Sequence, residues 1–403
     1  MLRYDEALGE IRRAALHLPL ATELCPLTEA LGRVLATELI APGDLPHWDN
    51  SAMDGFALRS ADTAGASPEQ PLALRIVGTG LAGEAVPEQP LAAGEARAIM
   101  TGAPMPPGAD SVVKVEDVQG RDDRLLLQAA VPAGQFVRRR GEDFRTGQTL
   151  LQVGQPVTPA VVMLGAALGI ATLTVWEQVP TAIVSTGNEL VDWRSPDLKP
   201  AQIRNSSQPF LAARLAQLGC DVRAQVSLGD DPVQFEQTLR NLWGQGIRLI
   251  LTTGAVSMGE ADFVPDSLGA LGCETRFHRV AIRPGKPVLL AIAPGQQGLV
   301  FACPGNPIST AVTTEFFLRP LLRQLRGETA TQLQLPLAAT VRKPEGLRCF
   351  FRARLTPEGQ VEVLGQQSSA ALLSLVEASH WAILLEAGRK IPAGTPVALV
   401  PIL

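Results

Sequence analysis

The sequence predicts a multidomain α/β and β protein built around a three-layer α/β domain with a parallel or mixed sheet. Strand-like and helix-like segments alternate from Val179 to about Gly327, a rhythm typical of βαβ units with helices on both faces of a sheet. Before this region, the stretch from Pro46 to Val137 is rich in glycine and proline and holds short strand-like runs, which indicates a small β-rich domain. After it, strand-like runs continue up to Val400 and indicate a second small β domain.

The chain is expected to open with two helices, because Asp5–His17 and Leu27–Leu39 both show helical spacing of apolar residues. A helical sequence pattern appears again near Pro159. We therefore expect one N-terminal body into which the β-rich domain is inserted. The predicted domains are 1–45 plus 141–177 for the N-terminal helical and β body, 46–140 for the inserted β-rich domain, 178–327 for the α/β domain, and 328–403 for a C-terminal, small β-barrel-like domain.

The α/β domain is expected to alternate its elements in a fixed order. Strands are predicted at 181–185, 222–227, 247–252, 288–291 and 299–302, and helices at 209–215 and 232–243. Gly219 follows the first of these helices and is expected to end it.

Composition excludes several classes of protein. The chain has 403 residues, 46% of them hydrophobic and 19% charged, which is typical of globular domains. Its net charge of −5 disfavours a nucleic-acid-binding surface. Its 5 cysteines are scattered without a CxxC pair, so we expect a reducing, cytoplasmic setting and neither a disulfide framework nor a zinc site.

One uncharged stretch, Val157–Trp176, is long enough to cross a bilayer. It is interrupted, however, by helix-start and helix-stop signals. Thr158 and Pro159 are typical of a helix start, and Gly169 is typical of a helix end before a short strand. We therefore predict a core helix followed by a strand, and no membrane span.

Three loops carry the strongest functional signal. Gly254–Asp262 follows a buried strand, Arg283–Pro287 precedes one, and Pro304–Pro307 follows another. Loops at the carboxyl ends of parallel strands converge on one crevice, where ligands bind. Because glycine lets backbone N–H groups approach an anion, and Arg283 and Lys286 add positive charge, the loops predict a phosphate or oxyanion site.

Acidic residues also follow the strand ends. Asp231 precedes Pro232 and is best explained as a helix N-cap. Glu189 and Asp230 lie in glycine-bearing loops, and Asp262 ends the loop that begins at Gly254, although it too has a capping position. Carboxylates beside cations are expected if a divalent ion bridges them to a phosphate, as Mg²⁺ does.

Two segments of the β-rich domain leave structural and functional interpretations open. Asp49–Ala57 is composed like an Asx-rich turn. Ile99–Asp110 is a rigid loop that offers the hydroxyl of Thr101. The basic run Arg138–Arg140 is most simply a solvated edge, and the histidines lack ligand spacing.

Taken together, these segments resemble the MoeA/gephyrin-E family of molybdopterin molybdenumtransferases. The resemblance runs in register over nearly the whole chain. It is carried by Asp49–Ala57, Thr101–Pro104, Arg138–Asp143, Ser185–Leu190, Gly254–Asp262, Arg283–Pro287 and Pro304–Ser309.

The resemblance implies an enzyme that inserts molybdenum from molybdate into adenylylated molybdopterin. It implies Mg²⁺-assisted hydrolysis of the adenylate, with release of molybdenum cofactor and AMP. It also implies an elongated four-domain homodimer in which Asp54 and Thr101 of one subunit join the α/β domain of the other. Contacts with the molybdopterin adenylyltransferase and with molybdoenzyme chaperones are expected, but none with nucleic acid or membrane.

The implied site residues fall into four groups. The catalytic group is Asp54, Thr101, Glu189, Asp230 and Asp262, of which Glu189, Asp230 and Asp262 are also the metal ligands. The cofactor-binding group is Ser185, Gly187, Gly254, Ser257, Gly259, Pro304, Gly305, Asn306 and Pro307. The molybdate-binding group is Arg283, Lys286, Pro287, Ser309, Arg352 and a C-terminal serine, Ser369 or Ser374.

The sequence departs from the family pattern at three positions, Asn188, Ala255 and Arg283, where an acid, a second glycine and a lysine are common. Arg283 keeps the positive charge, and Ala255 requires a backbone that tolerates Cβ. Two other functions stay open: a molybdopterin adenylyltransferase, which resembles the α/β domain alone, and a non-enzymatic cofactor carrier or scaffold. The additional domains, with Asp54 and Thr101, argue against the adenylyltransferase. The presence of Asp54, Glu189, Asp230 and Asp262 together disfavours the carrier or scaffold.

Overall fold

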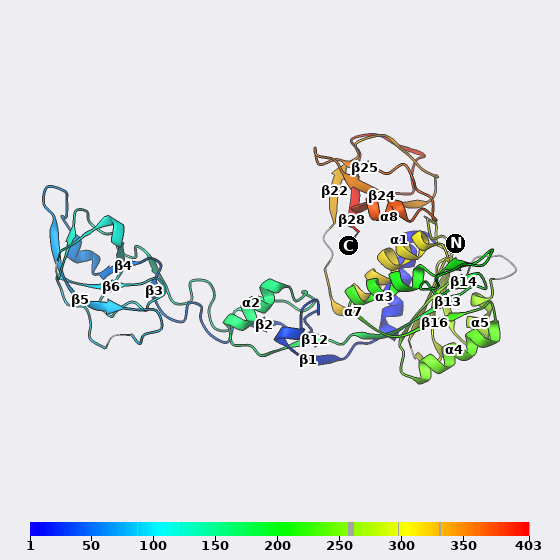
Figure 1. Ribbon diagram of the computed structural model, residues 1–403, viewed down its shortest axis with the longest axis horizontal. Coiled ribbons are helices and arrows are strands. Elements are labelled where there is room, and N and C mark those ends of the chain that lie inside the picture. Colours follow the sequence, from blue (N-terminus) through cyan, green and yellow to red (C-terminus); the bar gives the residue numbers. More distant parts are fainter. Residues whose placement is uncertain (87, 122, 257–261, 297, 330–331, 403) are drawn as a thin grey trace. The chain divides into compact units, whose positions relative to one another are not determined.

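The computed structural model describes residues 1–86, 88–121, 123–256, 262–296, 298–329 and 332–402. The chain forms two compact units (Figure 1). Unit 1 comprises residues 1–37, 153–166 and 170–403, and unit 2 comprises residues 38–152 and 167–169. Each unit is described by itself.

A six-stranded mixed sheet forms the centre of unit 1. Its strand order is β16-β13-β17-β21-β20-β18. The first four strands are parallel, while β20 and β18 run antiparallel to their neighbours. The strands are β13 (Val179–Thr186), β16 (Cys220–Leu228), β17 (Leu249–Thr253), β18 (Glu274–His278), β20 (Leu289–Ile292) and β21 (Leu299–Cys303).

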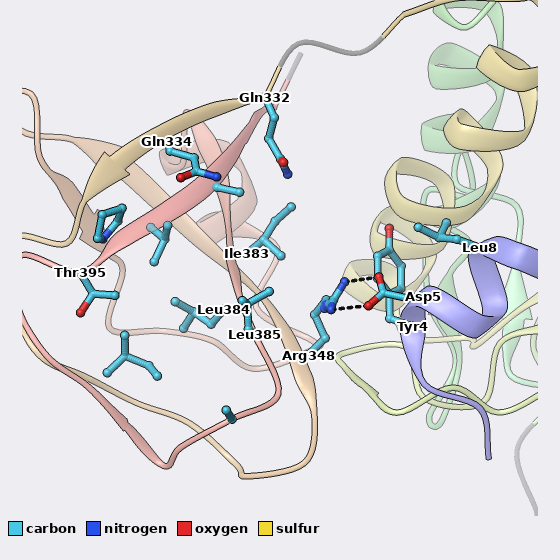
Figure 2. Close-up of a pocket in the computed structure, with 15 residues that line it drawn as sticks. Tyr4, Asp5, Leu8, Gln332, Gln334, Arg348, Ile383, Leu384, Leu385 and Thr395 are labelled. Carbon is cyan, nitrogen blue, oxygen red and sulfur yellow. Dashed lines mark hydrogen bonds and ion pairs between the residues drawn. The ribbon is translucent and has the colours of Figure 1, made fainter.

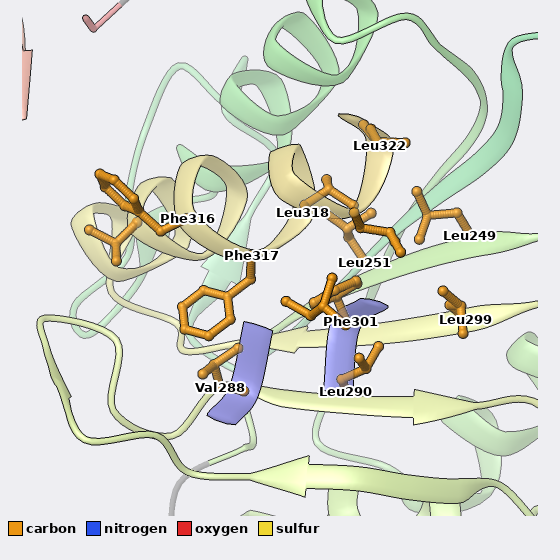
Figure 3. Close-up of a cluster of buried hydrophobic side chains, with 14 of the residues drawn as sticks. Leu249, Leu251, Val288, Leu290, Leu299, Phe301, Phe316, Phe317, Leu318 and Leu322 are labelled. Carbon is orange, nitrogen blue, oxygen red and sulfur yellow. The ribbon is translucent and has the colours of Figure 1, made fainter. Parts of the chain in front are cut away.

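Helices cover both faces of this sheet, because successive strand side chains point to opposite faces. On β13, Ile183 packs with one core, while Ala182 and Val184 pack with the other. Figure 3 shows the first core, in which Leu251 and Phe301 of the sheet meet the apolar side of the helices. The helices are α3 (Ser207–Gln217), α4 (Pro232–Gly244), α5 (Val264–Ala270), α6 (Pro307–Thr313) and α7 (Arg319–Arg326), with a π-helical turn (Thr314–Leu318) joining the last two.

The N-terminal segment contains one α-helix where the sequence suggested two. Helix α1 (Tyr4–Ala14) packs on the first core, but Leu27–Glu29 forms only a 3-10 turn. Gly32 then takes a positive φ of 77°, and its N–H bonds to the carbonyl of Val157. The predicted helix at 27–39 is therefore wrong, because long-range backbone pairing overrides the local apolar spacing. The neighbouring prediction is confirmed, since α2 (Pro159–Ala167) ends before Gly169 and β12 (Thr172–Trp176) pairs with β1 (Thr22–Pro26).

A second sheet of unit 1 has the order β19-β24-β26-β28-β22, with β25 paired to β24. Its first strand, β19 (Ile282–Arg283), belongs to the predicted anion loop and runs parallel to β24. The C-terminal strands are β22 (Leu333–Pro336), β24 (Arg348–Leu355), β25 (Val361–Val363), β26 (His380–Leu384) and β28 (Pro396–Pro401), with a short helix α8 (Leu373–Glu377). The pairing fixes Arg283 against the C-terminal strands.

Aromatic packing joins this sheet to the helices of the first core. Phe350 of β24 stacks on Phe316 at 3.9 Å between ring centroids, and Tyr4 of α1 meets Phe350 edge-on at 5.2 Å. Arg348, whose guanidinium lies 4.9 Å from the centroid of the Tyr4 ring, donates two hydrogen bonds to the carboxylate of Asp5 at 2.7 and 2.9 Å (Figure 2). A bidentate, charge-assisted pair of this kind adds directional stability to the apolar contact.

Unit 2 is built on a six-stranded sheet of order β7-β4-β6-β5-β9-β8. Its strands are β4 (Gly55–Leu58), β5 (Leu72–Gly80), β6 (Glu95–Ile99), β7 (Ser111–Lys114), β8 (Gln119–Arg121) and β9 (Arg124–Leu127), and two-stranded pairs join β2 (Leu39–Ile40) to β11 (Thr149–Leu151) and β3 (Asn50–Ser51) to β10 (Val137–Arg138). The multidomain α/β and β architecture is thereby confirmed. None of the described helices combines the length and apolar character needed to span a bilayer.

Candidate functional site

The first candidate cavity lies where β13, β17 and β21 end, and its volume is about 550 Å³. Open α/β sheets bind ligands at this carboxyl edge of parallel strands. We call it the glycine-loop cavity. It is lined by Thr186, Glu189, Leu190, Ile203, Arg204, Asn205, Ser206, Ser207, Thr253, Gly254, Gly305, Asn306, Pro307, Ala370 and Leu372. Four predicted cofactor-binding residues thus lie on its wall: Gly254, Gly305, Asn306 and Pro307.

The backbone at Gly254 explains the glycine of this loop. Its φ is 96°, and a Cβ atom there would lie only 2.3 Å from the carbonyl oxygen of Thr186. The next residue, Ala255, also has a positive φ, 48°. Ala255 therefore adopts the left-handed conformation that a second glycine would take more easily.

Hydroxyl groups tie the strand ends together beneath the cavity. The buried Thr253 hydroxyl donates to the Ser185 hydroxyl at 3.1 Å, and the Thr186 hydroxyl donates to the Thr253 carbonyl at 3.2 Å. Ser185, Gly187 and Pro304 are buried and do not line the cavity. In this structure they support the wall, and their predicted ligand contact stays a prediction. Ser257 and Gly259 lie outside the described residues.

The predicted acids lie on neighbouring loops. Glu189 is exposed on the cavity wall. Asp230 Oδ2 accepts a hydrogen bond from the Asn188 N–H at 3.1 Å, and Asn188 Oδ1 accepts one from the Asp230 N–H at 3.1 Å. Asn188, one of the departures from the family pattern, thus ties the Glu189 loop to the Asp230 loop.

The N-cap assigned to Asp231 is confirmed, because its side chain accepts from the backbone N–H groups of Val233 and Gln234. Asp262 is half-buried and lies just ahead of α5. Within the described ranges, no three His, Cys, Asp or Glu side chains are grouped closely enough to hold a metal ion. Glu189, Asp230 and Asp262 therefore do not form a closed cage.

The second candidate cavity has a volume of about 730 Å³ and surrounds the predicted anion loop. We call it the basic-loop cavity. It is lined by Ile282, Arg283, Pro284, Gly285, Lys286, Pro287, Ser309, Leu347, Gly365, Gln366, Gln367, Ser368 and Ser369. Five of the predicted molybdate-binding residues are thus brought together: Arg283, Lys286, Pro287, Ser309 and Ser369. Ser374, the alternative to Ser369, instead donates to the Ala371 carbonyl at 2.6 Å and is absent from this wall.

The electrostatics of the basic-loop cavity favour an anion. Its lining residues include two cations and no carboxylate. Arg283 and Lys286 are exposed, and within the part of the chain described here neither side chain has a hydrogen bond or ion pair. Their charges are therefore available to a ligand.

Arg352 lies behind this wall and does not line the cavity. Its side chain is fully buried, and one guanidinium nitrogen, Nη2, donates to the carbonyls of Gln366 at 2.8 Å and Ser368 at 3.0 Å. Among the described residues its Nε and Nη1 have no partner. Burial lowers the pKa of Arg352 to about 10. Arg352 shapes the loop that carries Ser369 and leaves two buried donors unsatisfied, which is energetically costly.

The wall also contains residues that the sequence reasoning did not single out. The polar run 366–368 and the segment 203–207 line the two cavities. A signal was present in both cases: Gln366–Ser368 is a polar run between strands, and Asn205–Ser207 precedes a helix as a capping segment does.

In unit 2, Asp54 and Thr101 contact each other directly. Asp54 Oδ1 accepts hydrogen bonds from the Thr101 N–H at 2.7 Å and from the Thr101 hydroxyl at 2.9 Å. These bonds, the backbone one first, lower the pKa of Asp54, so this exposed carboxyl stays ionised. The basic run has a structural role here, since Arg139 binds Asp49 at 2.7 Å and Arg140 binds Asp44 at 2.6 Å.

A further cavity of about 670 Å³, between α1 and the C-terminal strands, contains none of the predicted site residues (Figure 2). Its charged lining residues are engaged within the protein, because Arg348 pairs with Asp5 and also with Glu386.

Three family models match the chain in the order of its parts. These are the MoeA N-terminal region (domain I and II) over residues 2–169, a probable molybdopterin binding domain over residues 182–324, and the MoeA C-terminal region (domain IV) over residues 334–402. Together they cover most of the chain.

Similar proteins match over nearly the full length. A protein of Synechococcus elongatus named molybdopterin molybdenumtransferase is 57% identical, with 98% of each chain covered. A protein of Mycobacterium tuberculosis named molybdopterin molybdenumtransferase 2 is 38% identical, with 92% of each covered. Among solved structures, the molybdopterin biosynthesis MoeA protein of Pyrococcus horikoshii has a TM-score of 0.85 and 25% identity, with 99% of each chain covered.

Proposed function

The chain belongs to the MoeA family of molybdopterin molybdenumtransferases, and we propose that it inserts molybdenum from molybdate into adenylylated molybdopterin. In this reaction Mg²⁺-assisted hydrolysis of the adenylate releases AMP and molybdenum cofactor. The family membership supports the overall reaction, and the geometry of the two cavities supports the assignment of residues within it.

The observation that carries the proposal is that the two cavities share neighbouring residues. Pro307 lines the glycine-loop cavity, and Ser309, in the same turn of α6, lines the basic-loop cavity. Likewise, Ser369 lines the basic-loop cavity, and the next residue, Ala370, lines the glycine-loop cavity. Two ligands bound in these cavities would lie side by side, as transfer of an oxyanion to a pterin requires.

In the glycine-loop cavity, backbone groups would hold the anionic part of adenylylated molybdopterin. Gly254 and Gly305 lie on the cavity wall where their loops pack closely together, and Ser206, the N-cap of α3, and Ser207, its first residue, would offer backbone N–H groups at a helix N-terminus. Ser257 and Gly259 complete the proposed cofactor-binding set.

In the basic-loop cavity, Arg283 and Lys286 would bind molybdate. The guanidinium of Arg283 can contact two oxygens of a tetrahedral anion, and Lys286 adds a point charge. Ser309 and Ser369 offer hydroxyl donors on the same wall. Arg352, with its two unsatisfied donors, would then hold the Ser369 loop and add to the positive potential.

The donor set fits a magnesium ion that is completed by the substrate. Mg²⁺ is usually held by one or two carboxylates, water and substrate phosphate oxygens, so a closed cage of acids is not required. Glu189, Asp230 and Asp262 would hold it, and the ion would neutralise charge on the phosphate oxygens. Asn188 would keep the Glu189 and Asp230 loops in register.

We further propose the four-domain division given above and a homodimer in which Asp54 and Thr101 act on the partner's α/β domain. The family resemblance carries this part, and an exposed apolar surface supports the dimer. Helix α2 is apolar on all sides, yet its Met163 side chain is 72% exposed. Leu24 of β1 is 73% exposed as well. A helix that is apolar on all sides is normally covered.

The remaining proposals concern the setting of the reaction. We propose a cytoplasmic enzyme that receives its substrate from a molybdopterin adenylyltransferase and delivers its product to molybdoenzyme chaperones. The free thiols are consistent with a reducing compartment, and burial raises the pKa of the Cys303 thiol to about 12, which keeps it unreactive.

The test is incubation with adenylylated molybdopterin, molybdate and Mg²⁺, with AMP and molybdenum cofactor measured separately. The proposal predicts molybdate-dependent release of both products in equal amounts. Formation of adenylylated molybdopterin from ATP and molybdopterin, without molybdenum insertion, would instead identify an adenylyltransferase. Tight cofactor binding without either reaction would identify a carrier or scaffold.

A further inference from the structure

A fourth cavity of unit 1 lies at the C-terminal end of α3, the helix whose start lines the glycine-loop cavity. Its volume is about 250 Å³. It is lined by the C-terminal part of α3 and by α7, and by Gly32, Val34 and Pro156. We call it the arginine cavity, because Arg214, Arg319, Arg323 and Arg326 line it.

Positive charge exceeds negative charge around this cavity. Among the described residues, the carboxylates that face the four guanidinium groups are Glu328, on the wall, and Glu315, in the π-helical turn behind it. Glu315 is shared. It accepts a bidentate contact from Arg214, with 3.0 Å between Nη2 and Oε2, and it also pairs with Arg319 at 3.2 Å. Four cations facing two carboxylates leave an excess of two positive charges.

Arg326 is committed to the fold. Its two terminal nitrogens each donate to a carbonyl at the end of α3, Leu218 and Gly219, at 2.7 Å. Its distance to the carboxylate of Glu328 is 3.5 Å. Arg214 is equally committed, because its third nitrogen donates to Gln217 at 3.0 Å. The donors that stay available therefore belong to Arg319 and Arg323.

These two side chains lie one turn apart on α7, where like charges repel. Within the described part of the chain, the Arg323 side chain has no hydrogen bond and no ion pair within 4.0 Å. Burial, together with the charge of Arg319, lowers the pKa of Arg323. A half-buried, unpaired guanidinium beside a second cation is destabilised until an anion neutralises it.

We propose that the arginine cavity binds a tetrahedral dianion of the phosphate class, held by Arg319 and Arg323. Two guanidinium groups supply the paired N–H donors that phosphate oxygens prefer. The two negative charges of a dianion would also balance the excess of two positive charges around the cavity. The cavity is too small for a pterin dinucleotide. The 11 residues of α3 extend for about 16 Å, so this site is separate from the glycine-loop cavity that the start of the same helix lines.

The test is phosphate binding to the full-length protein in a Lys286→Gln background, which weakens competing binding at the basic-loop cavity. Equilibrium dialysis with inorganic phosphate should give one site per chain. Arg323→Gln should weaken that site about tenfold or more, the loss typical when a charge-assisted hydrogen bond is removed. Arg240→Gln is the matched control, because Arg240 is an exposed α4 residue that only pairs weakly with Glu236 at 3.6 Å, and it should leave phosphate binding unchanged.

Thermal unfolding separates binding from a structural role. Without phosphate, Arg323→Gln should unfold at the same temperature as the parent or higher, since repulsion from Arg319 is relieved. With phosphate, at ionic strength matched by chloride, the parent should gain stability and the variant should not. AMP serves as a second ligand: stabilisation by phosphate alone indicates a free ion, and equal stabilisation by both indicates that a phosphate ester also fits.

The proposal would be overturned by phosphate binding that is the same in the Arg323→Gln variant and in its parent. If, in addition, the dimer of that variant dissociated more readily, a carboxylate of a second chain, and not a small dianion, would fill the cavity.

Discussion

Arg214 and Arg283 carry the same guanidinium group in opposite surroundings. Arg214 is buried, and Glu315 meets it with both carboxylate oxygens. Arg283 is exposed on the wall of the basic-loop cavity, whose lining residues include no carboxylate. A buried charge needs its partner within the protein, because desolvation is costly. A charge that a cavity leaves unpaired is available to a ligand, so the difference separates the residues that hold the fold from those proposed to bind substrate.

The largest expected effect is a loss of stability when the buried ion pair between Arg214 and Glu315 is broken. Glu315→Gln removes the carboxylate that Arg214 and Arg319 share and leaves two poorly solvated cations. Breaking a buried ion pair in this way costs about 3–5 kcal/mol. The free energy of unfolding, measured by denaturant titration, should fall by that amount.

The matched control is Glu236→Gln, which breaks the exposed pair between Glu236 and Arg240 on α4. An exposed pair of this type contributes about 0–1 kcal/mol. If the two variants lose the same stability, the distinction between the buried pair and exposed charges is wrong.

The second prediction concerns the exposed cations of the basic-loop cavity. Lys286→Gln should raise the molybdate concentration needed for half-maximal insertion about 10- to 100-fold, because a charge-assisted contact is lost. Thermal stability should stay nearly unchanged, since Lys286 has no partner among the described residues. An unchanged molybdate dependence would mean that the loop is only a structural turn.

The sequence predicted the central sheet well because its signals are local. Apolar runs such as Leu249–Leu251 mark buried strands, and Gly219 ends a helix at a positive φ of 70°. The segment 27–39 was predicted wrongly because its apolar spacing is helical, while its backbone pairs with distant residues such as Val157. Only the tertiary structure contains that information.

The candidate site shows the same limit. Glycine and lysine in the loops could be read directly, and five of the predicted molybdate-binding residues share one cavity. The parallel pairing of Arg283 with Cys349 and the burial of Arg352 could not be predicted, because each depends on strands that are far apart in the sequence.

The third prediction tests whether the proposed catalytic site is completed by a second chain. Asp54→Ala and Asp262→Asn lie in different units of the chain, and each should inactivate its homodimer. In a heterodimer both lesions can fall into one of the two symmetric sites, which leaves the other site intact. Mixing equal amounts, with full subunit exchange, should restore about a quarter of the parent activity.

Mass spectrometry that verifies heterodimers, together with circular dichroism of each parent, provides the control. Verified heterodimers that stay inactive while both variants remain folded would contradict a site shared between subunits. The unmixed variants should stay inactive under the same exchange conditions.

The smallest expected effect concerns Asp54, whose Oδ1 accepts two hydrogen bonds from Thr101 and whose carboxylate has no ionic partner among the described residues. These bonds hold the folded-state pKa of Asp54 below its ordinary value. Their stabilisation is therefore present above the ordinary pKa of an aspartate and is lost as pH falls through the lowered one. Thr101→Val removes the hydroxyl bond but keeps the backbone bond, which is the larger cause, so the pKa of Asp54 should rise only part of the way. The acidic limb of the pH–activity profile should move to higher pH in Thr101→Val and should stay in place in Thr101→Ser, which keeps the hydroxyl. If both variants shift the limb equally, hydrogen bonding from the Thr101 hydroxyl does not set the ionisation of Asp54.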